Sequence, residues 1–240
     1  MKKILALYDL HVPFNIPLMP VWEFAQDFKP DVVVLGGDVH DWTSVCHWIA
    51  DQSRALDGGT IKENYDEMKR VALLPLEQAT GDAKKIYLTG NHEFWLHKAC
   101  EINPNLRGLV ELDRNLKNWK VYPLNVPYEA SRHLYYLHGV YVNLYHARKH
   151  VESYQKSVLY GHTHDCQSHT HISPIDVKHV IKGQSCGCLC KMNPGYMKNK
   201  PNKWVNAFSV AYVEEKTGFF WDYLVYIIDG RFVWNGRTYK

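Results

Sequence analysis

The sequence predicts an α/β fold in which a β-sheet is flanked by helices. Through the first half of the chain, short apolar runs alternate with segments of helical spacing, the β-α-β-α-β rhythm of such folds. Of the 240 residues, 46% are hydrophobic, which is enough to form a core and excludes a disordered chain. The second half is richer in strands. No internal repeat or linker divides the sequence, so we expect a single domain.

The first half supplies the alternating elements. Residues 31–35 read Asp-Val-Val-Val-Leu, a β-branched run typical of a strand that is buried on both faces. Further strands are expected at residues 3–8 and 85–89. Helical spacing predicts helices at 18–28, at 61–80 with a bend at Pro75, and at 92–100.

The second half is expected to hold one helix among several strands. The helix spans residues 145–155, between short strands at 132–137 and 157–160. Alternating segments from His169 onward predict strands at 179–183, 208–213, 220–228 and 231–234. Asp229-Gly230 is a hairpin signal between the last two. Residues 103–127 form a connection punctuated by Pro and Asn, with a short helix.

Composition narrows the class of protein. With 28 Lys and Arg against 25 Asp and Glu, the chain is only mildly basic, at a net charge of +3. Its apolar runs fall short of the roughly 18 residues that a membrane span requires, so we expect no membrane association. The apolar start breaks at Asp9, too early for a signal peptide. Scattered cysteines argue against a disulfide framework, so a cytoplasmic location is expected.

Metal-binding residue types follow each of five expected strands. Because ligands bind beyond the carboxyl ends of strands in α/β sheets, we expect these residues to meet at one edge. Glycines beside them allow sharp turns and a close approach to a bound ion or phosphate. The residues, in chain order, are Asp9 and His11, Asp38 and Asp41, Asn91 and His92, His138, and His162 and His164.

This ordered series resembles the calcineurin-like metallophosphoesterase superfamily over positions 3 to 165, and most of all its compact phage and bacterial members. The resemblance implies a sandwich of two mixed sheets with helices outside, the strands of about 168–240 completing the second sheet of a domain that spans 1–240. It also implies a dinuclear metal centre in which Asp38 bridges the two ions. One ion would be held by Asp9, His11, Asp38 and His164, and the other by Asp38, Asn91, His138 and His162.

The donor set agrees with that expectation. Carboxylate, imidazole and amide groups without thiolate suit Mn²⁺, Fe or Zn²⁺ better than Ca²⁺, and we expect two divalent ions, Mn²⁺ foremost, with Ni²⁺ as a further alternative. Two cations about 3.5–4 Å apart can hold a bridging hydroxide for in-line attack on phosphorus. The resemblance assigns His92 as the general acid, and Asp41 as the residue that fixes and charges it.

The expected function is hydrolysis of a phosphodiester, with nuclease activity as one form of it. A phosphomonoesterase or protein phosphatase is the first alternative, and a non-catalytic metal-binding or nucleic-acid-binding accessory protein is the second. Neither main subfamily matches fully, because repair nucleases tend to carry His where Asp41 stands, and protein phosphatases carry Arg where Trp42 stands. Lysines and aromatic residues at 191–204 suit either a nucleic-acid strand or a solvated loop. Oligomeric state cannot be read from the sequence.

Other histidines and cysteines are expected to be structural. His146 and His150 are assigned to a solvated or substrate-facing helix surface, and His40 to solvent. Glu93 is expected to begin a helix rather than to support the ligands. Alternation would send the thiols of the segment 186–190, Cys-Gly-Cys-Leu-Cys, to one strand face as small buried residues, with a zinc or redox site as the alternative.

Overall fold

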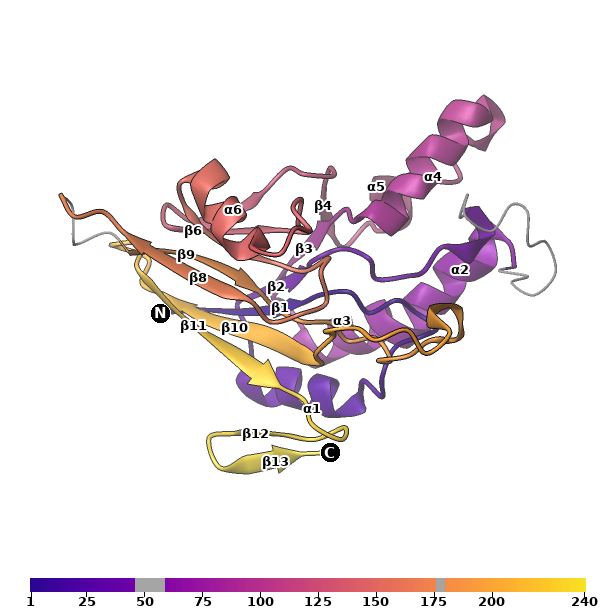
Figure 1. The fold of residues 1–240 in the computed structure, drawn as a ribbon. Helices are drawn as coiled ribbons and strands as arrows, with labels where there is room; N and C mark the ends of the chain where they lie inside the picture. The colour runs from indigo at the N-terminus through magenta and orange to yellow at the C-terminus, as the bar shows by residue number, and fades with distance from the viewer. Residues whose placement is uncertain (46–58, 176–179) are drawn as a thin grey trace.

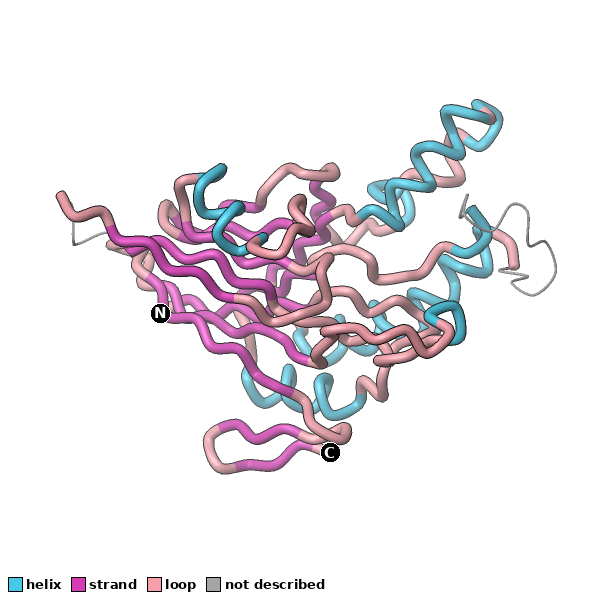
Figure 2. Tube along the Cα trace, in the orientation of Figure 1, coloured by secondary structure: helices cyan, strands magenta, loops and turns pink. Residues whose placement is uncertain are grey.

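The computed structural model describes residues 1–45, 59–175 and 180–240, and it confirms the predicted α/β class. Two mixed sheets are flanked by helices (Figures 1 and 2). The larger sheet has six strands in the spatial order β11 (Phe220–Tyr226), β10 (Ala207–Val213), β1 (Lys2–Leu7), β2 (Val32–Leu35), β3 (Lys84–Leu88) and β4 (Lys120–Tyr122). The smaller has five, in the order β5 (Tyr128–Ser131), β6 (Leu134–Leu137), β7 (Ser157–Tyr160), β9 (Val180–Ser185) and β8 (Ser168–Ile172).

Strands β1 to β4 are parallel, as are β6, β7 and β9. Alternate side chains of β1 point to opposite faces of its sheet. Ile4 and Ala6 enter an apolar cluster shared with Tyr136 and Leu159 of the smaller sheet. Leu5 and the other outward-facing side chains enter a second cluster, shared with the helices that cover the larger sheet. Burial on both faces explains why these strands read as continuous apolar runs.

The helices lie outside the two sheets. α1 (Met19–Phe28), α2 (Ile61–Met68) and α3 (Leu74–Thr80) contribute to the outer core of the larger sheet, α6 (His146–Tyr154) packs on β8 and β9, and α4 (Asn91–Ile102) projects away (Figure 1). A π-helical turn at Lys69–Leu73 joins α2 to α3 directly before Pro75, where a bend was expected. The short helices are Thr43–Val45, Pro104–Leu106, α5 (Leu112–Asn115) and Gly195–Met197.

The C-terminal strands divide between the sheets. β8 and β9 extend the smaller sheet, but β10 pairs antiparallel with β1, and β11 pairs with β10. The expectation that residues 168–240 complete the second sheet is therefore wrong for β10 and β11. β10 is almost entirely buried, and its pairing covers the edge of β1 that β2 leaves open.

The last hairpin also differs from the expectation. Asp229-Gly230 makes a turn closed by a single bridge between Ile228 and Arg231, whereas β12 (Phe232–Trp234) pairs with β13 (Arg237–Tyr239). Among the described residues, no helix has both the length and the apolar character that crossing a bilayer would require.

The histidines of α6 are buried, which corrects the prediction that they lie on a solvated surface. His150 stacks on Tyr160 of β7 with ring centroids 3.8 Å apart. Its Nδ1 donates to the carbonyl of His146, and its Nε2 accepts from the amide of Val140. These bonds require the neutral ring, and burial lowers the pKa of His150 to about 4.

This burial predicts a pH dependence of stability. The folded pKa of His150 lies below the unfolded value, so the unfolded chain binds more protons between about pH 4 and 6.5, and stability falls as the pH falls through that window. We expect His150→Gln to reduce the loss of unfolding free energy between pH 7 and pH 5 by about 1–2 kcal/mol. Urea unfolding of both proteins at pH 7 and pH 5, in the presence of EDTA, measures this difference in unfolding free energy. Equal losses in both proteins would contradict the assignment.

Candidate metal centre

The structure brings the predicted ligands together at one edge of the two sheets. Each lies in the segment that follows a strand: Asp9 and His11 come after β1, Asp38 and Asp41 after β2, Asn91 and His92 at the start of α4 after β3, His138 after β6, and His162 and His164 after β7. Several have left-handed backbone, an unfavourable conformation for residues with a side chain, costing roughly 1–3 kcal/mol each. These are Asp9 (φ 50°), His11 (φ 49°), Asp38 (φ 48°), His162 (φ 68°) and His164 (φ 59°).

One group of donors surrounds Asp9. Donor atoms of Asp9, His11 and His164 all lie within 4.8 Å of one another. Nε2 of His164 is 3.4 Å from Oδ1 of Asp9 and 3.2 Å from Nε2 of His11. Oδ1 of Asp9 is buried and has no hydrogen-bond partner among the described residues. A buried carboxylate oxygen facing two imidazoles in this way fits a cation site.

A second group surrounds Asp38. Donor atoms of Asp38, His138 and His162 also lie within 4.8 Å of one another. Nε2 of His138 is 3.4 Å from Oδ2 of Asp38 and 3.0 Å from Oδ1 of Asn91. The same Asp38 oxygen is 3.9 Å from Nε2 of His11, which belongs to the first group. Asp38 therefore lies between the two groups of donors.

The two carboxylates are held in the same manner. Oδ2 of Asp9 accepts the backbone N–H of His162 at 2.8 Å, and Oδ1 of Asp38 accepts that of His92 at 2.9 Å. In each case one oxygen is fixed by a neighbouring turn, and the other faces the imidazoles. This geometry points one oxygen of each aspartate at the space where ions would bind.

Bonds to the Nδ1 atoms orient several of the rings. Nδ1 of His138 is 2.9 Å from the carbonyl of Gly36, and Nδ1 of His11 is 2.9 Å from Oδ1 of Asp41. Nδ1 of His92 lies 3.0 Å from the carbonyl of Asp41 and 3.4 Å from its Oδ1. Asp41 thus contacts His92, as expected, and also holds the candidate ligand His11. Such bonds direct Nε2 toward a metal.

Glu93 supports the centre, a role that the sequence interpretation set aside. It is buried, and its carboxylate accepts the backbone N–H groups of Asp38, Val39 and Gly90 and the hydroxyl of Tyr87. Burial and the nearby Asp38 charge raise the pKa of Glu93. The capping-box spacing from Gly90 to Glu93 is the local signal of this contact. Glu93 fixes the β2 turn against the start of α4.

His40 is likewise not solvent-exposed, contrary to the expectation. It is fully buried, its Nδ1 accepts the backbone N–H of Trp42, and its ring lies 4.9 Å from that of Trp42. Burial lowers the pKa of His40 to about 4, so the ring is neutral at physiological pH. It packs beneath the turn that carries Asp38 and Asp41.

The electrostatics favour cation binding. Burial by itself would raise the pKa of Asp38, but the charges of His138 and His92 lower it well below its usual range. Against its own burial, His138 is brought to a pKa of about 10 by Asp38. Burial and the adjacent His138 lower the pKa of His162 to about 4. The carboxylates are therefore charged at neutral pH, and a protonated His138 balances them until a cation replaces its proton.

The chain has remote similarity to several solved protein structures. No protein-family model and no curated protein matches the chain. Among solved structures, Vps29 of Entamoeba histolytica is similar at 14% identity and a TM-score of 0.49, over 95% of this chain and 94% of that one. Vps29 of Chaetomium thermophilum is similar at 12% identity and a TM-score of 0.45, over 99% and 94%.

A protein of Streptococcus pneumoniae described as a predicted phosphoesterase is similar at 14% identity and a TM-score of 0.37, over 99% of this chain and 95% of that one. These similarities are too remote to assign a role to any residue of this chain.

Metal binding should release a proton from His138. Because its pKa is about 10, the ring is protonated at neutral pH without metal, and coordination requires the neutral ring. We expect the apparent affinity for Mn²⁺ to rise with pH by up to about tenfold per unit between pH 6 and 8. Calorimetry in buffers of different ionisation enthalpy counts the released protons. Binding that is independent of pH and of buffer would contradict this ion pair.

Proposed function

We propose that the protein is a metal-dependent phosphoesterase that uses two divalent cations, Mn²⁺ foremost, with Fe, Zn²⁺ or Ni²⁺ as alternatives. The observation that supports this most strongly is the position of Asp38. Its Oδ2 lies within 3.9 Å of imidazole nitrogens from both donor groups. Asp9, His11, Asp38 and His164 would hold one ion, and Asp38, Asn91, His138 and His162 the other.

The donor chemistry fits such a pair. Carboxylate and amide oxygens with imidazole nitrogens match Mn²⁺ and related ions. When bound, a pair of cations supplies Lewis acidity toward a phosphate ester and lowers the pKa of water. The protein contributes fixed, buried donors, and it contributes groups that can move a proton.

His92 is the proposed proton donor to the leaving oxygen. Its Nδ1 is anchored by the Asp41 carbonyl, and its Nε2 faces the centre, 3.9 Å from Oδ2 of Asp38. Oδ1 of the Asp41 carboxylate lies 3.4 Å from the same Nδ1 and helps to orient the ring. The His92 side chain is 18% exposed, so it can be reprotonated from solvent. Trp95 packs against the ring at 4.0 Å and limits its motion.

A phosphodiester is the proposed substrate class. The resemblance places a phosphate-clamping Arg of protein phosphatases at the position of Trp42. Trp42 is fully buried and carries no positive charge, so it cannot bind the dianionic phosphate of a monoester. The loop after β9 carries lysines at 191, 198, 200 and 203 that are exposed. Trp204 at its end lies 4.4 Å from the His164 ring. Basic groups beside an aromatic ring suit a nucleotide or nucleic-acid diester.

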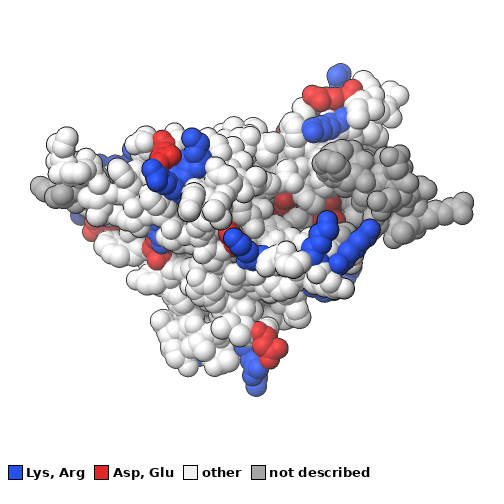
Figure 3. Space-filling view, in the orientation of Figure 1, with Lys and Arg blue, Asp and Glu red and all other residues white. Residues whose placement is uncertain are grey.

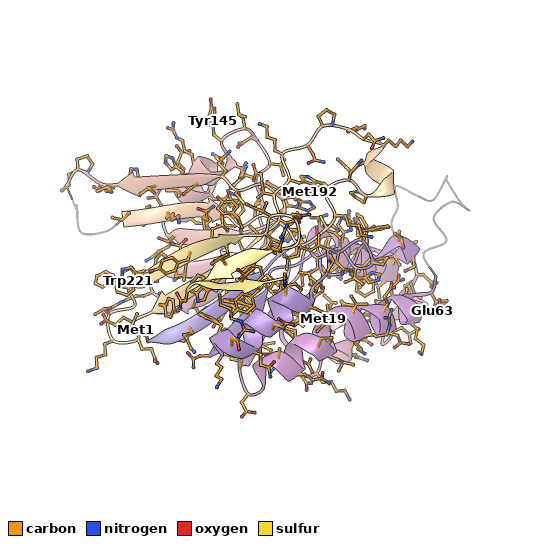
Figure 4. The ribbon with its side chains drawn as sticks, turned by 90° about the horizontal axis from the view of Figure 1, so that it is seen from below. Met1, Met19, Glu63, Tyr145, Met192 and Trp221 are labelled. Carbon is orange, nitrogen blue, oxygen red and sulfur yellow. The ribbon has the colours of Figure 1, made fainter. Side chains whose placement is uncertain are left out.

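The surface is consistent with this substrate. Figure 3 shows acidic atoms recessed within the surface, with Lys or Arg side chains standing nearby. Met192, on the same loop, is labelled in Figure 4, and its side chain is exposed. A phosphomonoester is the alternative substrate, and a metal-binding protein without turnover is the alternative function.

Asp38→Ala tests the shared carboxylate. Because Asp38 serves both donor groups, we expect its loss to lower Mn²⁺ content from two ions per chain to one or none. We also expect it to reduce hydrolysis of bis-p-nitrophenyl phosphate by at least about a thousandfold. Metal analysis and steady-state rates measure both. Wild-type protein that binds Mn²⁺ without hydrolysing diester or monoester would instead be a scaffold.

His92→Asn separates proton transfer from metal binding. We expect this variant to keep both metals and to lose about 10²–10⁴-fold in kcat on a diester with a poor leaving group. The loss should be smaller for p-nitrophenolate, which leaves without a proton. His97→Asn is the matched control, since His97 lies on the same helix but is exposed. Equal losses on both substrates would show that His92 is not the acid.

A further inference from the structure

Two thiols lie on the far side of His164 from the aspartates. Donor atoms of His164, Cys188 and Cys190 all lie within 4.8 Å of one another, and all three residues are buried. Nδ1 of His164 is 3.7 Å from Sγ of Cys190, while its Nε2 faces Asp9 and His11. His164 therefore lies between the proposed catalytic centre and the two thiols.

The third cysteine of the segment is placed differently. Cys186 lies in the apolar core between the sheets, where it is a small buried residue as expected. Gly187, with φ 70°, follows it in left-handed backbone. The regular alternation of the strand ends there, so the prediction that the three thiols share one strand face is wrong. Only Cys188 and Cys190 reach His164.

Nδ1 of His164 faces a different kind of partner from Nδ1 of the other histidine rings of the centre. Nδ1 of His11, His92 and His138 each faces an oxygen, from a carboxylate or a carbonyl. A ligand histidine usually donates its second N–H to such an oxygen. A neutral thiol is a weak acceptor, and it serves such a nitrogen poorly. The contacts of these atoms are long: Sγ of Cys188 is 3.7 Å from the carbonyl oxygen of Val205, and Sγ of Cys190 is 3.7 Å from Nδ1 of His164. A metal ion bound by the two sulfurs and Nδ1 would replace these weak contacts with stronger bonds.

The thiols are held rigidly. The amide of Cys188 donates to the carbonyl of Val205, and the amide of Leu189 to the carbonyls of Tyr8 and Asp9. The side-chain amide of Asn206 donates to the carbonyls of Cys188 and Cys190. The segment is thus bonded both to the end of β1 and to the start of β10. Such preorganised donors lower the entropic cost of binding an ion.

We propose that Cys188, Cys190 and Nδ1 of His164 form a binding site for a thiophilic cation such as Zn²⁺. The two thiols release their protons to solvent as the cation binds, and the resulting thiolates neutralise its two positive charges. Nδ1 supplies a third donor through its lone pair. Zn²⁺ takes Cys and His ligands in this manner, and the neutral complex suits a buried position.

The site would share His164 with the dinuclear centre. If both ring nitrogens of His164 were to bind metal, the ring would release its remaining proton to solvent and would be shared by the two sites as an imidazolate. The thiol site does not depend on hydrolytic activity, because its sulfur ligands take no part in the proposed reaction. Its test can therefore fail or succeed separately from that of the phosphoesterase.

Co²⁺ is the probe, because thiolate ligands give it a near-ultraviolet charge-transfer absorption that oxygen and nitrogen ligands do not. We expect this band in metal-stripped wild-type protein titrated with Co²⁺ under a phosphine reductant. It should disappear in Cys188→Ser/Cys190→Ser, together with one bound ion per chain. It should persist in Cys186→Ala, the matched control from the same segment, and in Asp38→Ala.

A second measurement needs no variant. X-ray absorption of wild-type protein saturated with Zn²⁺ should show sulfur scatterers at about 2.3 Å. Absence of a sulfur shell, or of the Co²⁺ band in wild-type protein, would overturn the proposal. So would a band that survives the double substitution or is lost equally in Cys186→Ala. Loss of activity in Asp38→Ala with the band retained would support both sites independently.

Discussion

The centre depends on keeping the Asp38 carboxylate charged in a buried position. Removing a carboxylate from water is costly unless hydrogen bonds and opposite charges compensate it. Here the backbone N–H of His92 donates to Oδ1 of Asp38, and the imidazoles of His11 and His138 face Oδ2. Glu93 ties the backbone of Asp38 to the start of α4. The turn, the helix and the ligands are thus parts of one arrangement around this charge.

That arrangement explains why β-strand ends rather than one motif carry the site. Parallel strands β1, β2 and β3 bring their carboxyl ends to one edge, and β6 and β7 of the smaller sheet contribute theirs from across the inter-sheet core. The left-handed turns at Asp9 and Asp38 then direct the side chains inward. Local backbone strain at these positions is offset by the bonds that the same carboxylates accept.

Much of this arrangement could be predicted from the sequence, because candidate ligands near strand ends depend on local patterns. The continuous apolar run predicted β2, and the metal-binding residue types shortly after each strand predicted the candidate site. The features that could not be predicted from the sequence depend on tertiary contacts. The polar sequence of α6 gives no indication that the His150 ring stacks on Tyr160. Glu93 has the pattern of an ordinary helix start, and its bond to the turn after β2 is a tertiary contact. The pairing of β10 with β1 joins opposite ends of the chain, which no local signal reports.

The central claim is that Asp38 lies between two cations. Crystals grown with Mn²⁺ and measured at its absorption edge test it most directly. The account predicts two anomalous peaks about 3.5–4 Å apart, with Oδ2 of Asp38 in contact with both, one beside Asp9 and His164 and the other beside His138 and His162. A single peak, or two peaks that Asp38 does not join, would contradict it.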